Sequence, residues 1–146
     1  MHIFICSNKH IKMEKIVNGF KALSDETRLR IINLFIKSRK NLCVCELMDA
    51  LRLPQYSISK ALIVLKGTEF LISKKEGTWV YYELNKEQSN NLLLFKFLEK
   101  YLDKKIFQDD EKRLNQRLLL RKNDKCVVGI IPEKELFKRI KEKIKR

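Results

Sequence analysis

The sequence predicts a mostly α-helical protein with one β-hairpin wing (α+β), arranged as a homodimeric winged helix-turn-helix. Two short helical segments, residues 44–51 and 55–66, lie about three residues apart, and the second is polar at its beginning, which is the helix-turn-helix pattern. Residues 70–84 then change to strand-like spacing, with a turn at Glu76 and Gly77 and aromatic and branched residues after it. A long apolar helix follows the hairpin, which completes the order of elements in a winged helix.

The spacing of apolar residues and the residue types typical of helix ends predict the helices before the hairpin. Residues 14–23 place apolar side chains at helical spacing. Ser24 offers an oxygen as the N-cap of a second helix, and Asp25 suits the first turn of that helix. Pro54 marks the beginning of the helix over residues 55–66, because proline is favoured near a first helical turn.

After Asn85, a long helix is expected to reach about Leu102. It carries more apolar side chains than one contact face requires, and we therefore expect it to be the dimerisation helix. From Asp103 the pattern continues as a charged helix, which the pair Asn123 and Asp124 interrupts. The apolar side chains that predict the dimerisation helix are Leu92, Leu93, Leu94, Phe95, Phe97 and Leu98.

The charge of the chain points to a polyanionic partner. The 146 residues contain 32 Lys and Arg against 18 Asp and Glu, a net charge of +14. No apolar run approaches the ~20 residues that cross a bilayer, and the N-terminus lacks the features of a signal peptide, so we expect a cytoplasmic protein with no membrane partner. We divide the chain into an N-terminal tail (1–13), a winged helix-turn-helix DNA-binding and dimerisation domain (14–102) and a basic helical C-terminal extension (103–146).

Cys43 and Cys45 stand one residue apart where a helix is predicted to begin. A disulfide between them would be strained by its one-residue loop, whereas a helix N-terminus favours thiolates, the ligands of soft metal and metalloid ions. An enzyme is not expected, because the chain has no phosphate-binding glycine loop and no histidine placed to activate a cysteine. The two histidines, His2 and His10, both lie in the N-terminal tail.

Four motifs in this order resemble the ArsR/SmtB family of winged-helix repressors. Residues 20–31 resemble the family's opening, residues 43–47 the metalloid-binding motif of its arsenic-responsive branch, residues 58–62 the recognition helix, and residues 75–82 the wing. The resemblance covers residues 14–102. It implies a homodimer that binds operator DNA when ligand-free and releases it on binding As(III) or Sb(III), with no organic cofactor. The implied genetic role is control of arsenic-resistance genes.

Two positions depart from the family pattern. The arsenic branch often has a third cysteine where this chain has Met48, although a trigonal As(III) site wants three thiolates. The site therefore has two ligands or takes a third from elsewhere. Cys126, in an apolar segment after a helix break, is the first candidate and Cys6 the second. The glycine that commonly ends the recognition helix is also replaced, near Glu69.

Other functions remain open from the sequence. A winged-helix repressor that senses oxidants through its thiols, or that senses another soft metal, is the main alternative. Zinc fits less well, because closed zinc sites usually take four ligands. A protein-interaction module that uses the basic C-terminal region without sensing is a third interpretation.

The DNA contacts are expected on the second helix of the helix-turn-helix and on the wing. The beginning of that helix enters the major groove, and a dimer with two such helices favours an inverted repeat. Ligand binding at the beginning of the preceding helix would then shift the helix pair and weaken DNA binding. The candidates are Gln55, Tyr56, Ser57, Ser59 and Lys60 on the helix, with Lys74, Lys75 and Thr78 on the wing.

Overall fold

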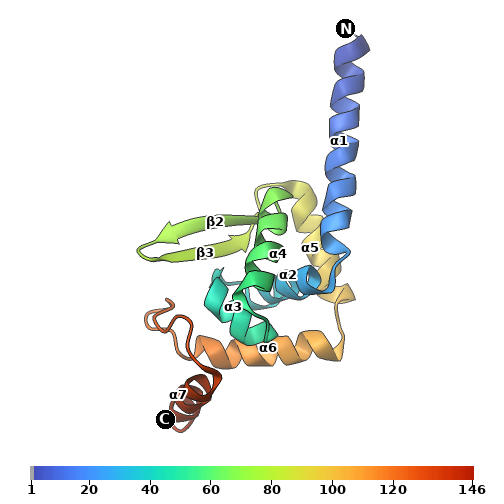
Figure 1. Ribbon diagram of the computed structural model, residues 1–146. Helices are drawn as coiled ribbons and strands as arrows, with labels where there is room; N and C mark the ends of the chain where they lie inside the picture. Colours follow the sequence, from blue (N-terminus) through green and yellow to red (C-terminus); the bar gives the residue numbers. More distant parts are fainter. Residues whose placement is uncertain (1) are drawn as a thin grey trace.

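The computed structural model describes the backbone of residues 2–146 and the side chains of residues 12–146. It confirms the mostly helical fold with a β-hairpin (Figure 1). The order of elements is α1 (His2–Leu23), α2 (Glu26–Ser38), β1 (Leu42–Cys43), α3 (Val44–Leu51), α4 (Gln55–Gly67), β2 (Leu71–Glu76), β3 (Trp79–Leu84), α5 (Ser89–Tyr101), α6 (Lys105–Leu118) and α7 (Glu133–Ile144).

The first two helices differ from the prediction at their ends. Helix α1 begins at His2, well before Glu14, and its first turns project away from the rest of the chain (Figure 1). Residues 1–13 show no clear apolar period, so the signal that indicates the helix from Glu14 could not reveal this earlier part. The N-cap of α2 is Asp25, whose carboxylate accepts the N–H of Arg28 at 3.0 Å. The prediction of Ser24 as the cap was wrong, because its hydroxyl instead donates to the carbonyl of Lys21.

Helix α2 forms the centre of the hydrophobic core. Its apolar face is fully buried, and α4, α5 and α6 pack around it. This core gives the helix-turn-helix pair α3 and α4 a fixed support, since side chains of both helices belong to the same cluster. The buried core residues of these three helices include Ile31, Ile32, Leu34, Phe35, Leu47, Leu51, Ile58, Leu62 and Leu65.

The sheet is antiparallel, with strand order β1-β3-β2. The hairpin β2–β3 is the predicted wing, whereas β1 has only two residues and was not predicted. Strand β1 pairs with β3 so that Cys43 lies opposite Tyr81. The turn after α4 puts Glu69 in the left-handed region (φ 63°), at the position where the family commonly has glycine.

Helix α6 packs along α2 and α3, and α7 follows after a loop. The α2–α6 contact is held by buried Asp110, which accepts two hydrogen bonds from Arg30 at 2.7 and 2.8 Å. The loop and α7 form a small separate apolar cluster around Leu120, Leu136 and Ile140. Over residues 2–146, no helix is both long and apolar enough to cross a membrane.

Candidate metal centre and nucleic-acid interface

Three cysteines meet in one buried cluster. The sulfurs of Cys43, Cys45 and Cys126 all lie within 4.8 Å of one another. The Sγ–Sγ distances are 3.2 Å between Cys43 and Cys45 and 3.4 Å between Cys45 and Cys126, and the three residues are only 2%, 4% and 1% exposed. The structure thus brings together the two cysteines of the motif and the first candidate for a third ligand. Cys6 lies outside the residues whose side chains are described.

The local backbone explains how cysteines two positions apart can converge. Within a regular helix, residues i and i+2 point in different directions. Cys43, however, is the last residue of β1 and the extended N-cap of α3 (φ −103°, ψ 166°), while Cys45 lies in the first helical turn. The strand-to-helix transition therefore turns both sulfurs to one side. Met48, where the family often has its third cysteine, packs instead against the main hydrophobic core.

The wing strand β3 forms one wall of the cysteine cluster. Tyr81 is buried against the three cysteines, and its hydroxyl accepts the backbone N–H of Cys126 at 2.9 Å. Trp79, the only tryptophan of the chain, packs partly buried on the same side. The cluster thus lies between the beginning of α3, the middle and turn end of the wing strand β3, and the loop after α6.

A buried ion pair stands beside the cluster. Arg121 donates to both carboxylate oxygens of Glu46, at 2.7 and 2.8 Å, and to the carbonyls of Asn41 and Asp124. Glu46 also accepts the backbone N–H of Cys43 at 3.1 Å. Burial lowers the pKa of Arg121, but the bonds to Glu46 more than offset this, so its pKa is raised and it stays charged. This one side chain ties together the segments that carry all three cysteines.

A second buried arginine extends the contact between α6 and α3. Arg117 donates to Asp49 at 2.6 Å and to the carbonyl of Gly129 at 3.0 Å. Its Nη1 has no hydrogen-bond partner among the described residues. Burial is the first cause that raises the pKa of Asp49, and the hydrogen bond from Arg117 opposes it. Arg113, one turn earlier, donates to the carbonyl of Ala50, so α6 runs antiparallel along α3.

The pKa values of the three cysteine thiols are shifted in different directions. Hydrogen bonds from Cys43 and Cys45 lower the pKa of Cys126 to about 2, despite its burial. Hydrogen bonding with Cys126 raises the pKa of Cys45 to about 12, and hydrogen bonds with Cys126 and Cys45, followed by burial, raise the pKa of Cys43. Hydrogen bonding among the three sulfurs thus favours the thiolate form at Cys126 and the thiol form at Cys43 and Cys45. Such a set of soft donors suits a thiophilic ion, and a ligand that binds the sulfurs as thiolates must displace the protons that they carry.

Sequence reasoning missed Tyr81, Glu46, Arg117 and Arg121 as parts of this site. Arg117 and Arg121 are four residues apart in the predicted charged helix, and Asp49 and Glu46 are three apart in α3, which is the spacing of one helix face. In the structure α6 ends at Leu118, and Arg121 follows it. This complementary spacing is a signal that could have paired the two helices. In a charged helix, however, arginines at this spacing more commonly form a solvated face.

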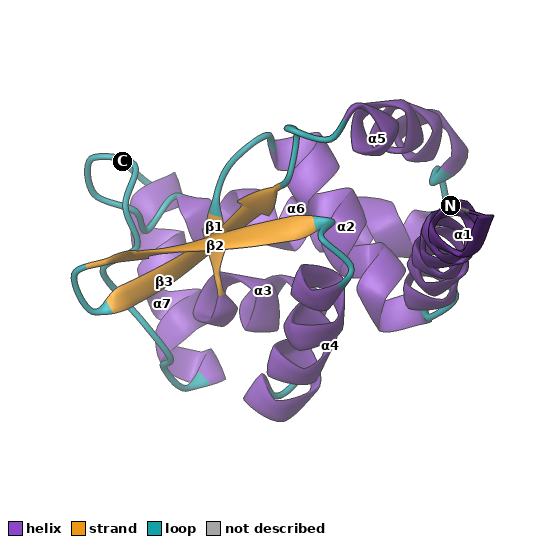
Figure 2. Ribbon diagram, turned by 90° about the horizontal axis from the view of Figure 1, so that it is seen from above, coloured by secondary structure: helices purple, strands orange, loops and turns teal. Residues whose placement is uncertain are grey.

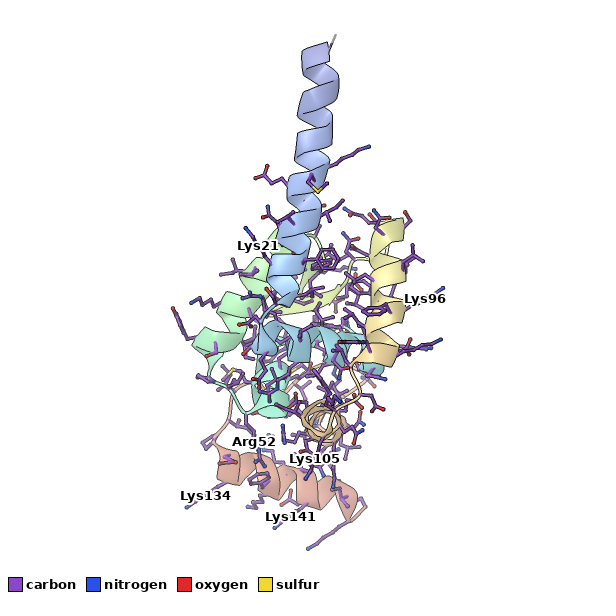
Figure 3. The ribbon with its side chains drawn as sticks, turned by 90° about the vertical axis from the view of Figure 1, so that its right-hand side faces the viewer. Lys21, Arg52, Lys96, Lys105, Lys134 and Lys141 are labelled. Atoms are coloured by element: carbon purple, nitrogen blue, oxygen red, sulfur yellow. The ribbon has the colours of Figure 1, made fainter. Side chains whose placement is uncertain are left out.

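The candidate DNA-binding residues lie on an open side of the molecule. Figure 2 shows α4 at the edge of the fold, with the hairpin extending beside it. All eight candidates are exposed or half-buried: Gln55, Tyr56, Ser57, Ser59, Lys60, Lys74, Lys75 and Thr78. Basic side chains also project from α1, α5, α6 and α7, as the labelled lysines of Figure 3 show, so charge alone does not locate the DNA.

Apolar side chains remain exposed on two helices. On α5, Leu93, Phe97 and Tyr101 are 69%, 57% and 69% exposed, and Phe97 stacks on Tyr101. On α1, Ile16 and Phe20 are 53% and 66% exposed. These exposed side chains are the apolar surface of each of the two helices, and surfaces of this kind commonly associate with a partner.

The chain is similar to transcriptional regulators of arsenic resistance. The sequence model of the family described as bacterial regulatory protein, arsR family, matches residues 25–73. The arsenic resistance transcriptional regulator ArsR2 of Pseudomonas putida is 52% identical over 68 residues, which are 47% of this chain and 58% of that protein. The arsenical resistance operon repressor of Bacillus subtilis is 36% identical over 81 residues, which are 56% of this chain and 76% of that protein. The match thus spans little more than half of the first of these relatives.

Solved structures have the same fold. Reduced HlyU from Vibrio cholerae superposes with a TM-score of 0.56 at 25% identity, covering 66% of this chain and 98% of that one. The homodimeric winged helix-turn-helix domain of Mb0332 from Mycobacterium bovis superposes with a TM-score of 0.56 at 22% identity, covering 64% of this chain and 82% of that one. The winged helix-turn-helix predicted from the sequence is therefore confirmed.

Proposed function

Because this chain belongs to the arsR family of bacterial regulatory proteins, we propose that it is a cytoplasmic transcriptional repressor that releases operator DNA on binding As(III) or Sb(III). Its relatives are regulatory proteins and not enzymes. The observation that carries the proposal is the cluster of Cys43, Cys45 and Cys126, whose sulfurs lie within 4.8 Å in a buried position. The genes it controls would be those of arsenic resistance.

The charge of the site supports a trivalent soft ion. Three thiolates around a trivalent ion form a neutral unit, which can stay buried without a large desolvation cost. The neighbouring charges already compensate each other, since Arg121 pairs with Glu46 and Arg117 with Asp49. A divalent ion at three thiolates would leave a net negative charge in the buried site. The site therefore favours As(III) or Sb(III) over zinc.

The DNA partner is proposed to be an inverted repeat bound by a homodimer. Helix α4 would enter the major groove with Gln55 and Lys60, and the wing would place Lys74 on the backbone. The apolar surface of α1 and α5 supports pairing of two chains, and dimer pairing would set the spacing of the half-sites. Residues 14–102 form the DNA-binding and dimerisation domain in this proposal, residues 1–13 precede it, and residues 103–146 are an extension that supplies Cys126.

Helix α3 provides the link between the ligand and the DNA. It begins at the cysteine cluster and leads through the turn at Arg52 into α4. A ligand that draws three sulfurs together acts on the beginning of α3 and on its contact with α6. We expect the ligand to bind more tightly to an arrangement of α3 and α4 that fits DNA poorly. The difference in ligand binding free energy between the two arrangements then sets how far operator affinity falls.

The test is fluorescence anisotropy of the reduced protein on labelled DNA from its own promoter, titrated with arsenite. We expect release at near-stoichiometric arsenite and no release by zinc. Cys43→Ser and Cys126→Ser should bind the DNA normally but respond much more weakly. Tight DNA binding that arsenite leaves unchanged would refute metalloid sensing while keeping a DNA-binding protein.

A thiol-based redox sensor is the second candidate, and the 3.4 Å between the sulfurs of Cys45 and Cys126 favours it. A peroxide would oxidise one thiol to a sulfenic acid, and attack by the second sulfur would form a disulfide and release water. Release of DNA by peroxide, reversed by a dithiol and independent of arsenite, would support this candidate instead.

A further inference from the structure

We infer that Tyr81 is a positioning residue of the cysteine site, which holds Cys126 in place and connects the site to the wing. The inference rests on the proposed function. Tyr81 is 3% exposed, and its hydroxyl accepts the N–H of Cys126 at 2.9 Å. Its backbone pairs with Cys43 in the β1–β3 register. Tyr81 therefore contacts both the segment that carries Cys126 and the strand that carries Cys43.

Cys126 needs such an anchor because no helix or strand holds it. It lies in the segment that we call the strap, residues 122–131. The strap turns sharply at Asn123 and Asp124, both with positive φ, and a backbone bridge between Lys122 and Lys125 closes this turn. A loop residue must be ordered before it can serve as a ligand, and a hydrogen bond that already orders it lowers this cost.

The strap lies along the hairpin at several points. Lys125 forms an ion pair with Glu76 near the tip of the wing, at 3.4 Å between Nζ and Oε2. Further along, Gly129 lies so close to Trp79 that a Cβ at this position would be 3.0 Å from the ring. The strap residue between these contacts is Cys126, bonded to Tyr81. Figure 1 shows the loop that leaves α6 rising toward the hairpin.

Tyr81 also stands in one register row with a candidate DNA contact. The row crosses the sheet from Cys43 on β1 to Tyr81 on β3 and Lys74 on β2. Because paired strands move together through their hydrogen bonds, a displacement of Tyr81 is transmitted to Lys74. Capture of an ion by Cys126 would therefore act on the wing as well as on α3.

The experiment compares Tyr81→Phe with Tyr82→Phe in the full chain. Tyr82 is the neighbouring tyrosine, half-buried and packed against the main core, and it serves as the matched control. Arsenite binding is followed by the fluorescence of Trp79, which packs on the site, and operator binding is followed by anisotropy. We expect Tyr81→Phe to bind arsenite about tenfold more weakly or worse, as is typical when a ligand loses its supporting hydrogen bond.

Two further readouts separate positioning from a merely structural role. Operator affinity without arsenite should stay near the wild-type value in both variants. The melting temperature should fall by a few degrees in Tyr81→Phe, because the buried N–H of Cys126 loses its acceptor, and should stay near the wild-type value in Tyr82→Phe. In a Cys126→Ser background, Tyr81→Phe should add no further loss of arsenite affinity, because both changes then act on the same ligand. Amide exchange at Cys126 should be slow in the wild-type protein and faster in Tyr81→Phe.

The outcomes of these measurements distinguish a failure of the positioning role of Tyr81 from a failure of the proposed arsenite response. Wild-type arsenite affinity in Tyr81→Phe, additive losses with Cys126→Ser, or rapid exchange of the Cys126 amide in the wild-type protein would each overturn the positioning role. These results would leave the proposed function intact if the wild-type protein still releases DNA. A wild-type protein in which arsenite changes neither Trp79 fluorescence nor DNA binding would overturn both.

Discussion

Arg121 and Glu46 form a doubly hydrogen-bonded ion pair whose side chains are 3% and 0% exposed, and this pair holds the segment that follows α6 against α3, the helix that carries Cys45. Glu46 also accepts the backbone N–H of Cys43. The same carboxylate therefore both holds the segment around Arg121 in place and orients the backbone at Cys43 in the cysteine cluster.

Glu46→Gln is expected to destabilise the protein strongly. It leaves Arg121 buried without its counter-charge, and breaking one partner of a buried pair typically costs about 3–5 kcal/mol. The free energy of unfolding in urea measures this loss. The exposed pair of Arg139 and Glu135 on α7 offers the control, since Glu135→Gln should change the unfolding midpoint little. Equal effects of the two substitutions would contradict the importance of the buried pair.

Lys74→Ala is expected to weaken DNA binding without changing sequence preference. If Lys74 lies on a phosphate, its removal should reduce the slope of log affinity against log salt by about 1. Gln55→Ala should instead relax the preference at one base pair. Lys96→Ala, on α5 at the opposite side of the molecule from α4 (Figure 3), is the control for the loss of one positive charge. A slope that Lys74→Ala and Lys96→Ala lower equally would argue against a wing contact.

Leu93→Glu is expected to convert the proposed homodimer to a monomer. The side chain is 69% exposed in the single chain, and a carboxylate buried in an apolar interface would raise the dimer dissociation constant by about a hundredfold or more. Sedimentation equilibrium measures the oligomeric state. Ile63→Glu changes an equally exposed apolar residue (73%) on α4 and should leave the dimer intact. Dissociation by the α4 variant alone would place the interface elsewhere.

Gly129→Ala is expected to disturb the strap. Gly129 has φ +70°, where an L-residue costs about 1–2 kcal/mol, and the new Cβ would meet Trp79. We expect lower stability, a changed Trp79 fluorescence and weaker arsenite binding. Gly67→Ala is the control, because Gly67 lies in α4 with open space around it, and alanine there should be neutral or stabilising by about 0.4–1 kcal/mol. An unchanged Trp79 fluorescence in Gly129→Ala would show that the strap does not pack against Trp79.

The order of the elements and the chemistry of the cysteine motif can be predicted from local patterns in the chain. The period of the apolar residues indicated α2, α3 and α4, and the turn at Gly77 indicated the wing, because these signals depend on neighbours within a few positions. Local spacing also pointed to Cys43 and Cys45 as a soft-ion ligand pair. For the third ligand it ranks Cys126 first and Cys6 second.

Which side chains meet depends on how the helices and the wing pack in three dimensions. Cys126 reaches the pair because Arg117 and Arg121 bond to carboxylates of α3, some seventy residues earlier in the chain. The same holds for the cap of α2, where Asp25 accepts the N–H of Arg28 while Ser24 donates to Lys21. It also holds for Tyr81, whose hydroxyl meets the N–H of Cys126 from a distant segment. Hydrogen bonds and ion pairs between distant segments depend on how whole helices pack, and no spacing within one segment records that packing.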